Sequence, residues 1–336
     1  MKTKQPTVVI DAAIPFLEEA LRPYCRVVSV VGSAMSAADV ADAEAIVVRT
    51  RTQCNEQLLG RSPVKLVITA TIGSDHIDWA WCQQAGIRVV TAAGCNARGV
   101  LQWVAAVLAN LARKEGWHPS ERTLGVVGVG HVGSLVKAYA EAWGFRVVCC
   151  DPPREEREQL GFRSLEEVAT EADILTFHTP LDSSTYHLCD RALIGRMKSS
   201  VVVLNAARGG VVDEEALLEA GIPYVCDVWE GEPNLRPAVL EKALFATPHV
   251  AGYSAQGKAN ASAIAADELA RWFGWPIEGW YPAQVTPPAP RPIGWEELLA
   301  SIDSYYDIAA ESEALKRQPA DFEQMRDEYR YRLEYF

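Results

Sequence analysis

The sequence TLGVVGVGHVGSLVKAYAEAW at residues 123–143 decides the fold. Its first five residues are those of a buried strand, and the residues after the last glycine have the spacing of a helix. Gly128, Gly130 and Gly133 form the pattern GxGxxG, in which glycine lets the backbone approach a pyrophosphate and the helix start supplies free N–H groups. The pattern alone is weak, but here it stands between a strand and a helix, and Asp151 follows the next strand. Together they predict a Rossmann domain that binds a dinucleotide.

Asp151 indicates which dinucleotide this domain binds. It ends the run FRVVCCD, and it stands about 20 residues after the glycines, as the dinucleotide-binding fingerprint requires. A carboxylate at this place accepts hydrogen bonds from the adenosine ribose and repels a 2′-phosphate, so we predict NAD rather than NADP as the cofactor. The alternative is a plain glycine turn, with an Asp that only opens the bend at Pro152-Pro153.

Short β-branched runs alternate with helical spacing on both sides of this motif. Before it, runs typical of strands occupy residues 7–11, 26–31, 45–48, 65–69 and 87–90, and from residue 123 the pattern restarts with runs that are apolar on both faces. Such alternation with few hairpin signals predicts parallel sheets covered by helices on both faces. We therefore predict an α/β protein with two doubly wound parallel-sheet domains, one of them flavodoxin-like and one Rossmann-type.

Two long apolar stretches and a proline-rich segment suggest the domain boundaries. Residues 97–115 and 254–273 both have the pattern of long helices, and the second could cross back to the first domain. Residues 282–292 contain five prolines, which favour an extended linker. We predict a discontinuous substrate-binding domain, an NAD-binding domain and a helical C-terminal segment for dimerisation, at residues 1–94 with 252–280, 95–251 and 281–336 respectively.

Two helices are predicted after the linker, WEELLASIDSYYDIAAESEALKRQ at 295–318 and DFEQMRDEYRYRLEYF at 321–336, and both have apolar and charged sides. About 45 residues are too few for a comfortable core of their own, so this segment should pack against the body of the chain or against a partner subunit. A homodimer is the prediction that follows.

The composition argues against two classes of partner. With 336 residues, 49% of them hydrophobic, the chain can form two domains with packed cores. Its formal net charge of −12 repels phosphate backbones and anionic lipid, so we predict no nucleic-acid partner and no membrane partner. Any anionic substrate must therefore meet a local positive pocket.

The cysteines and the N-terminus indicate a cytoplasmic protein without a metal site. The eight cysteines are scattered, with no CxxC pair and no Cys/His spacing typical of zinc. Asp11 and Pro15 interrupt the first apolar run too early for a signal-peptide core. No stretch approaches the ~18 uncharged apolar residues of a membrane span.

Polar residues follow four of the predicted strands. Because ligands of open α/β sheets bind at the carboxyl ends of the strands, these are candidate site residues. They are His178-Thr179-Pro180, NAARGG at 205–210, DVWEGEP at 227–233 and Thr247-Pro248-His249.

These motifs, in this order, resemble the D-isomer-specific 2-hydroxyacid dehydrogenase family. The wording TATIGSDHID, AGCNA, CDPPR, NAARGGVVD and DVWEGEP is similar, more narrowly, to the branch that oxidises a phosphorylated hydroxy acid in vitamin B6 biosynthesis. The resemblance covers roughly residues 7 to 275, and SYYDI and FEQMRDEYRYRLEY are similar to that branch's dimerisation domain. It implies NAD-dependent oxidation of 4-phospho-D-erythronate at C2.

The resemblance also assigns residues to roles. It makes Arg208 the cation that binds and polarises the substrate, Glu232 the orienting carboxylate and His249 the acid/base. Residues implied to bind the cofactor are Gly128, Gly130, His131, Val132, Gly133, Asp151, Thr179, Ala206, Ala207, Arg208, Asp227 and Gly252. Those implied to bind substrate are Arg49, Thr50, Thr71, Ile72, Gly73 and Tyr253.

The chemistry of the reaction agrees with these roles. Oxidation of a secondary alcohol needs a base on the hydroxyl, a cation beside the C1 carboxylate and a nicotinamide for the hydride. Histidine has the side-chain pKa nearest neutrality, and a carboxylate partner fixes its tautomer. A turn such as Thr71–Ser74 can bind a carboxylate through backbone N–H groups, although a plain turn is the alternative.

Several alternatives remain open at this point. His76, expected at the start of a helix, and His178 compete with His249 for the base, and Glu230 competes with Glu232. Arg49 and Arg51 could bind the substrate's phosphate or be a surface basic pair, and C-terminal arginines of a partner subunit, such as Arg326 and Arg330, are a further source of cations. The chain could instead be a phosphoglycerate or hydroxypyruvate-type dehydrogenase, or an NAD-sensing scaffold resembling corepressors of the same fold.

Overall fold

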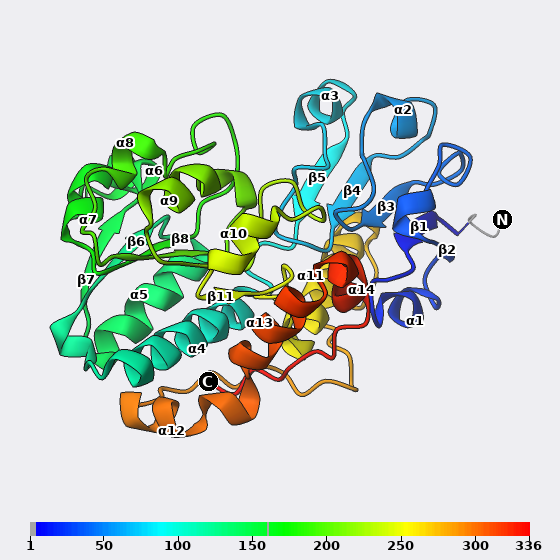
Figure 1. Ribbon diagram of the computed structural model, residues 1–336. Coiled ribbons are helices and arrows are strands. Elements are labelled where there is room, and N and C mark those ends of the chain that lie inside the picture. Colours follow the sequence, from blue (N-terminus) through cyan, green and yellow to red (C-terminus); the bar gives the residue numbers. More distant parts are fainter. Residues whose placement is uncertain (1–4, 160) are drawn as a thin grey trace. The chain divides into compact units, whose positions relative to one another are not determined.

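The chain folds into two compact units, each built on its own parallel sheet (Figure 1). The structure, a computed structural model, describes residues 5–159 and 161–336. The first unit comprises Met1–Asn96 with Ala255–Pro288, and the second comprises Ala97–Ser254 with Ala289–Phe336. Residues 289–336, predicted as part of a separate piece, thus lie in the second unit.

The first unit has a five-stranded sheet in the order β2-β1-β3-β4-β5, with every pair parallel. This is the flavodoxin-like strand order. The strands are β1 (Thr7–Asp11), β2 (Arg26–Val30), β3 (Ala45–Val48), β4 (Leu66–Thr69) and β5 (Arg88–Thr91), and the helices are α1 (Leu17–Leu21), η1 (Gly32–Ala34), α2 (Glu56–Leu59), α3 (Trp79–Gln84) and α11 (Ala255–Phe273).

Both faces of this sheet are covered, which explains its continuous apolar strands. On β1, Val8 packs in one cluster with Leu269 of α11, whereas its neighbour Val9 packs in another with Cys82 of α3. Because successive side chains of a strand point to opposite faces, two buried faces need two consecutive apolar residues. The helix predicted at 254–273 is therefore confirmed as α11 and belongs to the first unit, as its position in the sequence had suggested.

The second unit has a six-stranded parallel sheet in the order β11-β10-β9-β8-β6-β7. The order reverses between β6 and β8, and in such sheets the ligand crevice lies at the carboxyl ends of the strands at that point. The strands are β6 (Thr123–Val127), β7 (Arg146–Cys150), β8 (Ile174–Phe177), β9 (Val202–Asn205), β10 (Tyr224–Cys226) and β11 (Phe245–Ala246). The predicted fold class, two doubly wound parallel-sheet domains, is confirmed.

Helices surround the second sheet. They are α4 (Ala97–Glu115), η2 (Pro119–Glu121), α5 (His131–Trp143), α6 (Pro152–Glu158), α7 (Leu165–Glu171), α8 (Arg191–Ile194), η3 (Gly209–Val211), α9 (Glu214–Ala220), α10 (Pro237–Lys242), α12 (Trp295–Tyr305), α13 (Ile308–Arg317), η4 (Pro319–Asp321) and α14 (Phe322–Asp327). The helix predicted at 97–115 is α4, and most of its side chains are buried.

The C-terminal residues complete the core of the second unit. Figure 1 shows α12 alongside α4, and Trp295, Leu298 and Phe336 share a buried cluster with α4. On the other face of the sheet, Leu315 and Phe322 join a second cluster. The segment is therefore an integral part of this unit.

Three local expectations are wrong. His76 lies in a turn, three residues before α3 begins at Trp79, and not at a helix start. The helix expected through the end of the chain stops at Asp327, and residues 328–336 form neither helix nor strand, apart from a bridge between Arg332 and Ser254. The helix expected at 295–318 is instead two helices, because α12 ends at its cap residue Tyr306 and α13 begins at Ile308. Among residues 328–336, Arg332 and Phe336 are buried, and their positions do not follow the spacing of a helix.

The described residues show no membrane-spanning helix, no metal-binding cluster and no disulfide. Within residues 5–159 and 161–336 no helix is long and apolar enough to cross a membrane. No group of three His, Cys, Asp or Glu side chains in those ranges could hold a metal ion. All eight cysteines are buried and carry free thiols.

Candidate active site

The glycine loop after β6 begins the candidate site. Gly128 has φ 84°, and a Cβ there would lie 2.8 Å from the backbone oxygen of His178. At Gly133 a Cβ would lie 2.0 Å from the oxygen of Gly128, so the helix could not pack on the turn with any larger residue. At Gly130 a Cβ would meet nothing. The chain itself therefore does not require glycine at Gly130, which fits a backbone approached by an external group.

Asp151 is fixed against this loop. One carboxylate oxygen accepts a hydrogen bond from the backbone N–H of Val129 at 2.7 Å, and the other caps α6 by accepting from Arg154 N at 3.0 Å. The Arg154 guanidinium in turn donates to the backbone oxygen of Val129 at 2.6 Å. The carboxylate thus lies beside the start of α5, where His131 and Val132 begin the helix, at the place expected for the adenosine ribose.

Two residues follow β8 at the crevice. The hydroxyl oxygen of Thr179 is buried and has no hydrogen-bond partner among the described residues. An orphaned buried hydroxyl next to an open glycine loop fits a bound dinucleotide. His178 contacts Thr176 Oγ1 through Nε2 at 3.1 Å, and burial lowers its pKa to about 3. A ring that stays neutral at physiological pH and lies next to the glycine loop is a poor proton acceptor.

The loop after β9 carries Arg208. Asn205 is buried and shapes the loop, since its side chain accepts from Ala207 N at 3.1 Å and donates to Arg208 O at 2.9 Å. The side chain of Ala206 packs against the core beneath the loop. A Cβ at Gly209 would lie 2.1 Å from the backbone oxygen of Trp229. The missing side chain thus lets the Arg208 loop pack directly on the loop that carries Glu232.

His249 and Glu232 form a pair. His249 Nδ1 lies 2.5 Å from Glu232 Oε1, and the side chains are 28% and 26% exposed. The other Glu232 oxygen accepts from Trp229 N at 3.2 Å. With Nδ1–H donated to the carboxylate, Nε2 is the ring nitrogen left to exchange a proton with a substrate.

The charges around Glu232 keep it ionised. Burial raises its pKa, but the hydrogen bond and charge of His249 outweigh burial and hold the pKa below its usual value. The guanidinium of Arg326, on α14 of the same chain, lowers this pKa further. An ionised Glu232 can stabilise the imidazolium that forms when His249 accepts a proton.

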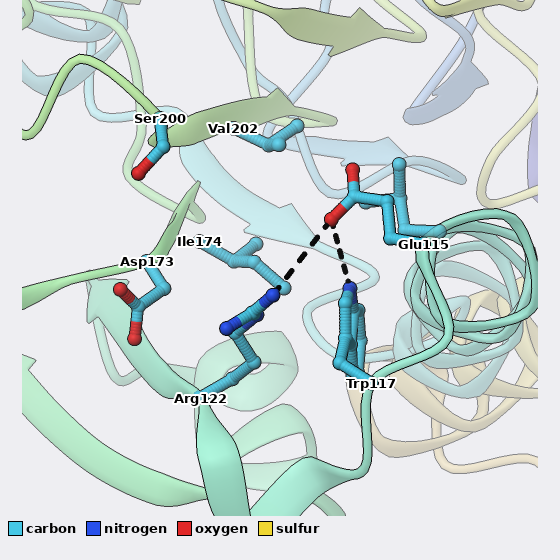
Figure 2. Close-up of a pocket in the computed structure, with 8 residues that line it drawn as sticks. Glu115, Trp117, Arg122, Asp173, Ile174, Ser200 and Val202 are labelled. Carbon is cyan, nitrogen blue, oxygen red and sulfur yellow. Dashed lines mark hydrogen bonds and ion pairs between the residues drawn. The ribbon is translucent and has the colours of Figure 1, made fainter.

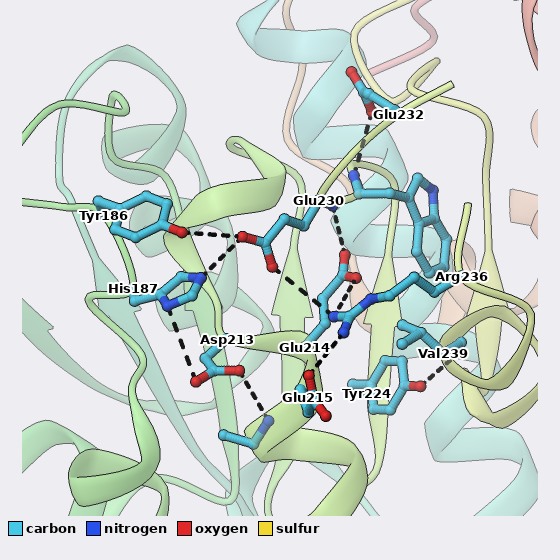
Figure 3. Close-up of polar contacts among 12 residues, drawn as sticks. Tyr186, His187, Asp213, Glu214, Glu215, Tyr224, Glu230, Glu232, Arg236 and Val239 are labelled. Atoms are coloured by element: carbon cyan, nitrogen blue, oxygen red, sulfur yellow. Dashed lines mark hydrogen bonds and ion pairs between the residues drawn. The ribbon is translucent and has the colours of Figure 1, made fainter. Parts of the chain in front are cut away.

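Glu230, the rival carboxylate, points into a different cluster (Figure 3). It accepts from Tyr186 OH at 3.2 Å and contacts His187 Nε2 at 3.1 Å, while its backbone N–H donates to Glu214 at 2.7 Å. Arg236 bridges the cluster by an ion pair with Glu214 at 3.1 Å. The geometry therefore pairs Glu232, and not Glu230, with His249.

The last predicted residues of this unit follow His249. Gly252 lies 3.2 Å from the position of a Cβ on Gly99 at the start of α4. The ring of Tyr253 packs edge-on against Tyr329 at 5.7 Å and Tyr331 at 6.0 Å. Asp227 is almost fully buried beneath the same turn and bonds to its backbone.

The sequence-based reasoning missed the C-terminal contacts of this turn. The sequence offers Arg326 only as an alternative cation from a partner subunit, and nothing in it singles out Arg332, which is buried beneath the residues after His249. Isolated basic residues in a segment without periodicity carry no signal of burial.

The predicted substrate residues of the first unit form two turns. Thr71 donates to Gly73 O at 3.0 Å and contacts Thr69 Oγ1 at 2.6 Å, while Ile72 packs in a small apolar cluster. Arg49 donates to the backbone oxygen of Ala13 at 3.4 Å, and Thr50 is exposed.

A small pocket in the second unit is separate from these residues (Figure 2). Ile174 and Val202, which begin β8 and β9, line it together with Glu115 at the end of α4. It lies at the amino ends of the strands, opposite the glycine loop. Ligands of this fold bind at the carboxyl ends, so we do not assign the pocket a role in catalysis.

Comparisons with known proteins agree with this geometry. The model of a family described as D-isomer specific 2-hydroxyacid dehydrogenase, NAD binding domain, matches residues 96–251. The chain is 43% identical to erythronate-4-phosphate dehydrogenase of Bacteroides fragilis, with 97% of each chain covered. It is 40% identical to the erythronate-4-phosphate dehydrogenase of Citrobacter koseri, covering 98% of this chain and 92% of that protein.

Solved structures extend the comparison. D-lactate dehydrogenase from Aquifex aeolicus, complexed with NAD and lactic acid, matches with a TM-score of 0.70 at 26% identity, covering 84% of this chain and 100% of that chain. NAD⁺-bound 3-phosphoglycerate dehydrogenase from Entamoeba histolytica has a TM-score of 0.68 at 23% identity, covering 82% and 98%, and shows the same fold.

Proposed function

The chain belongs to the D-isomer-specific 2-hydroxyacid dehydrogenase family, and on that premise we propose that it oxidises 4-phospho-D-erythronate with NAD⁺. The product would be (R)-3-hydroxy-2-oxo-4-phosphooxybutanoate, in the biosynthesis of pyridoxal 5′-phosphate. The family is one of NAD-dependent dehydrogenases. The finer assignment rests on the relatives of about 40% identity, which carry the name erythronate-4-phosphate dehydrogenase over nearly the whole chain.

The observation that carries the chemistry is the His249–Glu232 pair on loops packed beside Arg208. NAD⁺, when bound, supplies the acceptor for the hydride that leaves C2. His249 Nε2 removes the hydroxyl proton, and Glu232 stabilises the positive ring that results. Arg208 holds the C1 carboxylate and polarises the oxygen at C2.

The cofactor would lie along the carboxyl ends of β6 to β9. The open Gly130, the half-buried Asp151 and the orphaned hydroxyl of Thr179 support this position. Ala206 and Ala207 belong to the loop after β9, and Gly252 belongs to the loop after β11. Asp227 lies beneath the turn that precedes Gly252. A free N–H at the start of α5 suits the pyrophosphate.

This substrate carries a phosphate in addition to the carboxylate that all hydroxy acids have. We assign the C1 carboxylate to Arg208 and to the turn of Thr71, Ile72 and Gly73, and the phosphate to Arg49 and Thr50, with Tyr253 as a further contact. A net charge of −12 makes local cations necessary for a phosphorylated acid.

We also propose that the enzyme is a cytoplasmic homodimer. The free thiols of all eight buried cysteines suit a reducing compartment. Exposed Tyr305, Tyr331 and Leu333 of the C-terminal segment support a second copy as partner.

One experiment tests the substrate. NADH production from 4-phospho-D-erythronate is compared with that from 3-phosphoglycerate and D-lactate at matched concentrations. We expect the highest kcat/KM of the three substrates for 4-phospho-D-erythronate. Faster oxidation of 3-phosphoglycerate would favour the phosphoglycerate-type enzyme, and NAD binding without turnover of any hydroxy acid would favour the scaffold.

A further inference from the structure

The turn that carries His249 is held from one side by Asp227. Its Oδ1 accepts from Val250 N at 2.8 Å and from Thr247 Oγ1 at 2.6 Å, and its Oδ2 accepts from Ala251 N at 2.9 Å. The backbone N–H of His249 donates to Asp227 O at 2.7 Å. Every backbone donor of the turn from 249 to 251 is therefore bonded to this one buried residue.

Arg332 holds the same turn through its acceptors. Nη1 donates to the backbone oxygen of Val250 at 3.1 Å, and Nη2 donates to that of Ala251 and, at 3.0 Å, to that of Gly99. The residue is only 7% exposed. Val250 and Ala251, the two residues after His249, thus donate their N–H groups to a carboxylate, and their oxygens accept from a guanidinium.

The C-terminal segment builds a socket for this guanidinium. Tyr306 places its ring 4.1 Å from the Arg332 carbon Cζ, and Tyr329 accepts a hydrogen bond from Nη1 at 2.8 Å. Glu311 accepts from the hydroxyls of Tyr306 at 2.8 Å and Tyr329 at 2.6 Å. Burying a guanidinium is costly unless its donors are used. Here Nη1 and Nη2 donate to the backbone next to His249, whereas Nε has no hydrogen-bond partner among the described residues.

The backbone conformation of His249 explains why the turn needs the contacts with Asp227 and Arg332. Its φ is 57°, in the left-handed region that residues with a Cβ rarely adopt. Such a conformation is strained and persists only where the surroundings determine it. The same turn sets the direction of the imidazole, which must meet Glu232 on one side and a substrate on the other.

We propose that Arg332 is a positioning residue for His249, so that the C-terminal segment of each chain completes the active site of its own chain. It holds the strained turn, and thereby the 2.5 Å contact of His249 with Glu232. This inference rests on the proposed acid/base role of His249. It does not depend on which hydroxy acid is the substrate.

The test compares Arg332→Gln and Arg332→Lys with Arg317→Gln, which removes an exposed arginine from α13 of the same segment. We expect Arg332→Gln to lower kcat at least tenfold while KM and the Kd for NADH change less than threefold. Arg332→Lys, which can keep a donor at one or two of the three oxygens, should recover part of kcat. Arg317→Gln should behave as wild type.

Two readouts separate positioning from a purely structural role. The limb of the kcat/KM pH profile that reports the histidine should move to lower pH in Arg332→Gln, because an imidazolium that is poorly aligned with Glu232 is less stable. In the Glu232→Gln background the Arg332→Gln loss should shrink, because both changes weaken the same pair. If Arg332→Gln fails to bind NADH, Arg332→Lys decides by the same readouts.

The outcomes also distinguish this inference from the proposed function. An NADH-binding Arg332 variant with wild-type kcat and pH profile would overturn the inference while leaving the dehydrogenase assignment intact. If the wild type oxidised no hydroxy acid, the proposed function would fail, and titration of the His249 ring by NMR, assigned through His249→Ala, would still test the inference. An unchanged titration in Arg332→Gln would then reject it.

Discussion

At the scale of single residues, His249 carries the proton transfer. His249→Ala should lower kcat by roughly 10²- to 10⁴-fold, the usual contribution of a general acid/base. NADH affinity should hardly change, because the glycine loop and Asp151 are held by contacts that do not involve His249. Initial rates and fluorescence titration with NADH measure the two effects. Glu232→Gln should act in the same direction but more weakly, and an alanine variant with more than about a third of wild-type turnover would rule His249 out.

Asp151 should set the choice between NAD and NADP. Its carboxylate lies beside the glycine loop, so Asp151→Ala should narrow the preference for NAD by removing the repulsion of a 2′-phosphate. The substitution also removes the cap of α6, which costs about 1 kcal/mol. Asp190→Ala, which removes the corresponding cap of α8, is the control for that loss. The ratio of kcat/KM with NAD to kcat/KM with NADP measures the preference of each variant. Equal use of the two cofactors by the wild type would contradict the role assigned to Asp151.

His178 should make the fold sensitive to acid. Burial lowers its pKa from 6.5 to about 3. Below pH 6.5 the unfolded chain takes up a proton that the folded chain does not, so stability from this residue is complete above pH 6.5 and is lost toward pH 3. The loss is at most about 1.4 kcal/mol per pH unit. His178→Gln keeps a partner for Thr176 but cannot titrate. Urea unfolding at pH 7 and pH 5 should therefore show up to about 2 kcal/mol less acid destabilisation in the variant. An equal loss in both proteins would show that His178 does not stay neutral in the folded chain.

At the scale of elements, the predictable parts are those whose burial follows a period. Strands such as β1 and β6 are apolar on both faces because helices cover both, and this continuity is visible in the sequence. α4 and α11 are long enough for their pattern to be unambiguous. In the β6–α5 loop, Gly128 and Gly133 are likewise required by steric contacts with the backbone, whereas Gly130 has no such contact.

The unpredictable parts depend on contacts between residues far apart in the chain. No local pattern shows that Arg332 bonds to Val250 and Ala251, or that His249 has a positive φ. Nor could spacing decide between Glu230 and Glu232. That choice follows from Glu230 facing Tyr186 and His187 on another loop.

The end of β3 bears on the substrate's phosphate. Side chains alternate along a strand, so Arg49 and Arg51 would share a face only if β3 continued through them. The strand stops at Val48, and Arg49 to Arg51 form a turn, so this condition is not met. Arg49 bonds only weakly, at 3.4 Å, to Ala13 in the contacts described. Arg49→Ala should raise KM for 4-phospho-D-erythronate at least tenfold, since a charge-assisted hydrogen bond contributes about 1.5–3 kcal/mol.

A substrate without a phosphate is the control for this prediction. Turnover of an unphosphorylated D-2-hydroxy acid by Arg49→Ala should match that of the wild type. Equal losses on both substrates would make Arg49 a structural residue or a carboxylate ligand. Arg326 would then be the next candidate, because it lies near Glu232 and Tyr253 in the same chain and its Nε has no hydrogen-bond partner among the described residues.

At the scale of the whole molecule, the C-terminal segment has two surfaces. Its inner side contributes Trp295, Leu298 and Phe336 to the core around α4. Truncation near Pro287, the direct way to remove a dimerisation segment, would therefore also unfold the second unit. α4, whose long apolar pattern would make it an alternative interface, is mostly buried within its own unit and is a poor surface for a partner. A test of the homodimer has to change the outer side alone.

Leu333 offers that change. It is 60% exposed, and an apolar side chain of this size on the same segment as exposed Tyr305 and Tyr331 is expected at an interface between copies. Its contact with the body is through the backbone, where its oxygen accepts from Gln102 at 3.3 Å, so substitution should leave the fold intact. Leu333→Asp places a charge on the proposed contact surface and should shift the mass in light scattering toward that of one chain, 36.8 kDa. Val31→Asp, at a residue 62% exposed in the first unit, is the matched control and should remain dimeric. Because each active site is completed by its own Arg332, the Leu333→Asp monomer should retain dehydrogenase activity, and a monomer that folds and binds NADH but is inactive would show that the second copy contributes to the site.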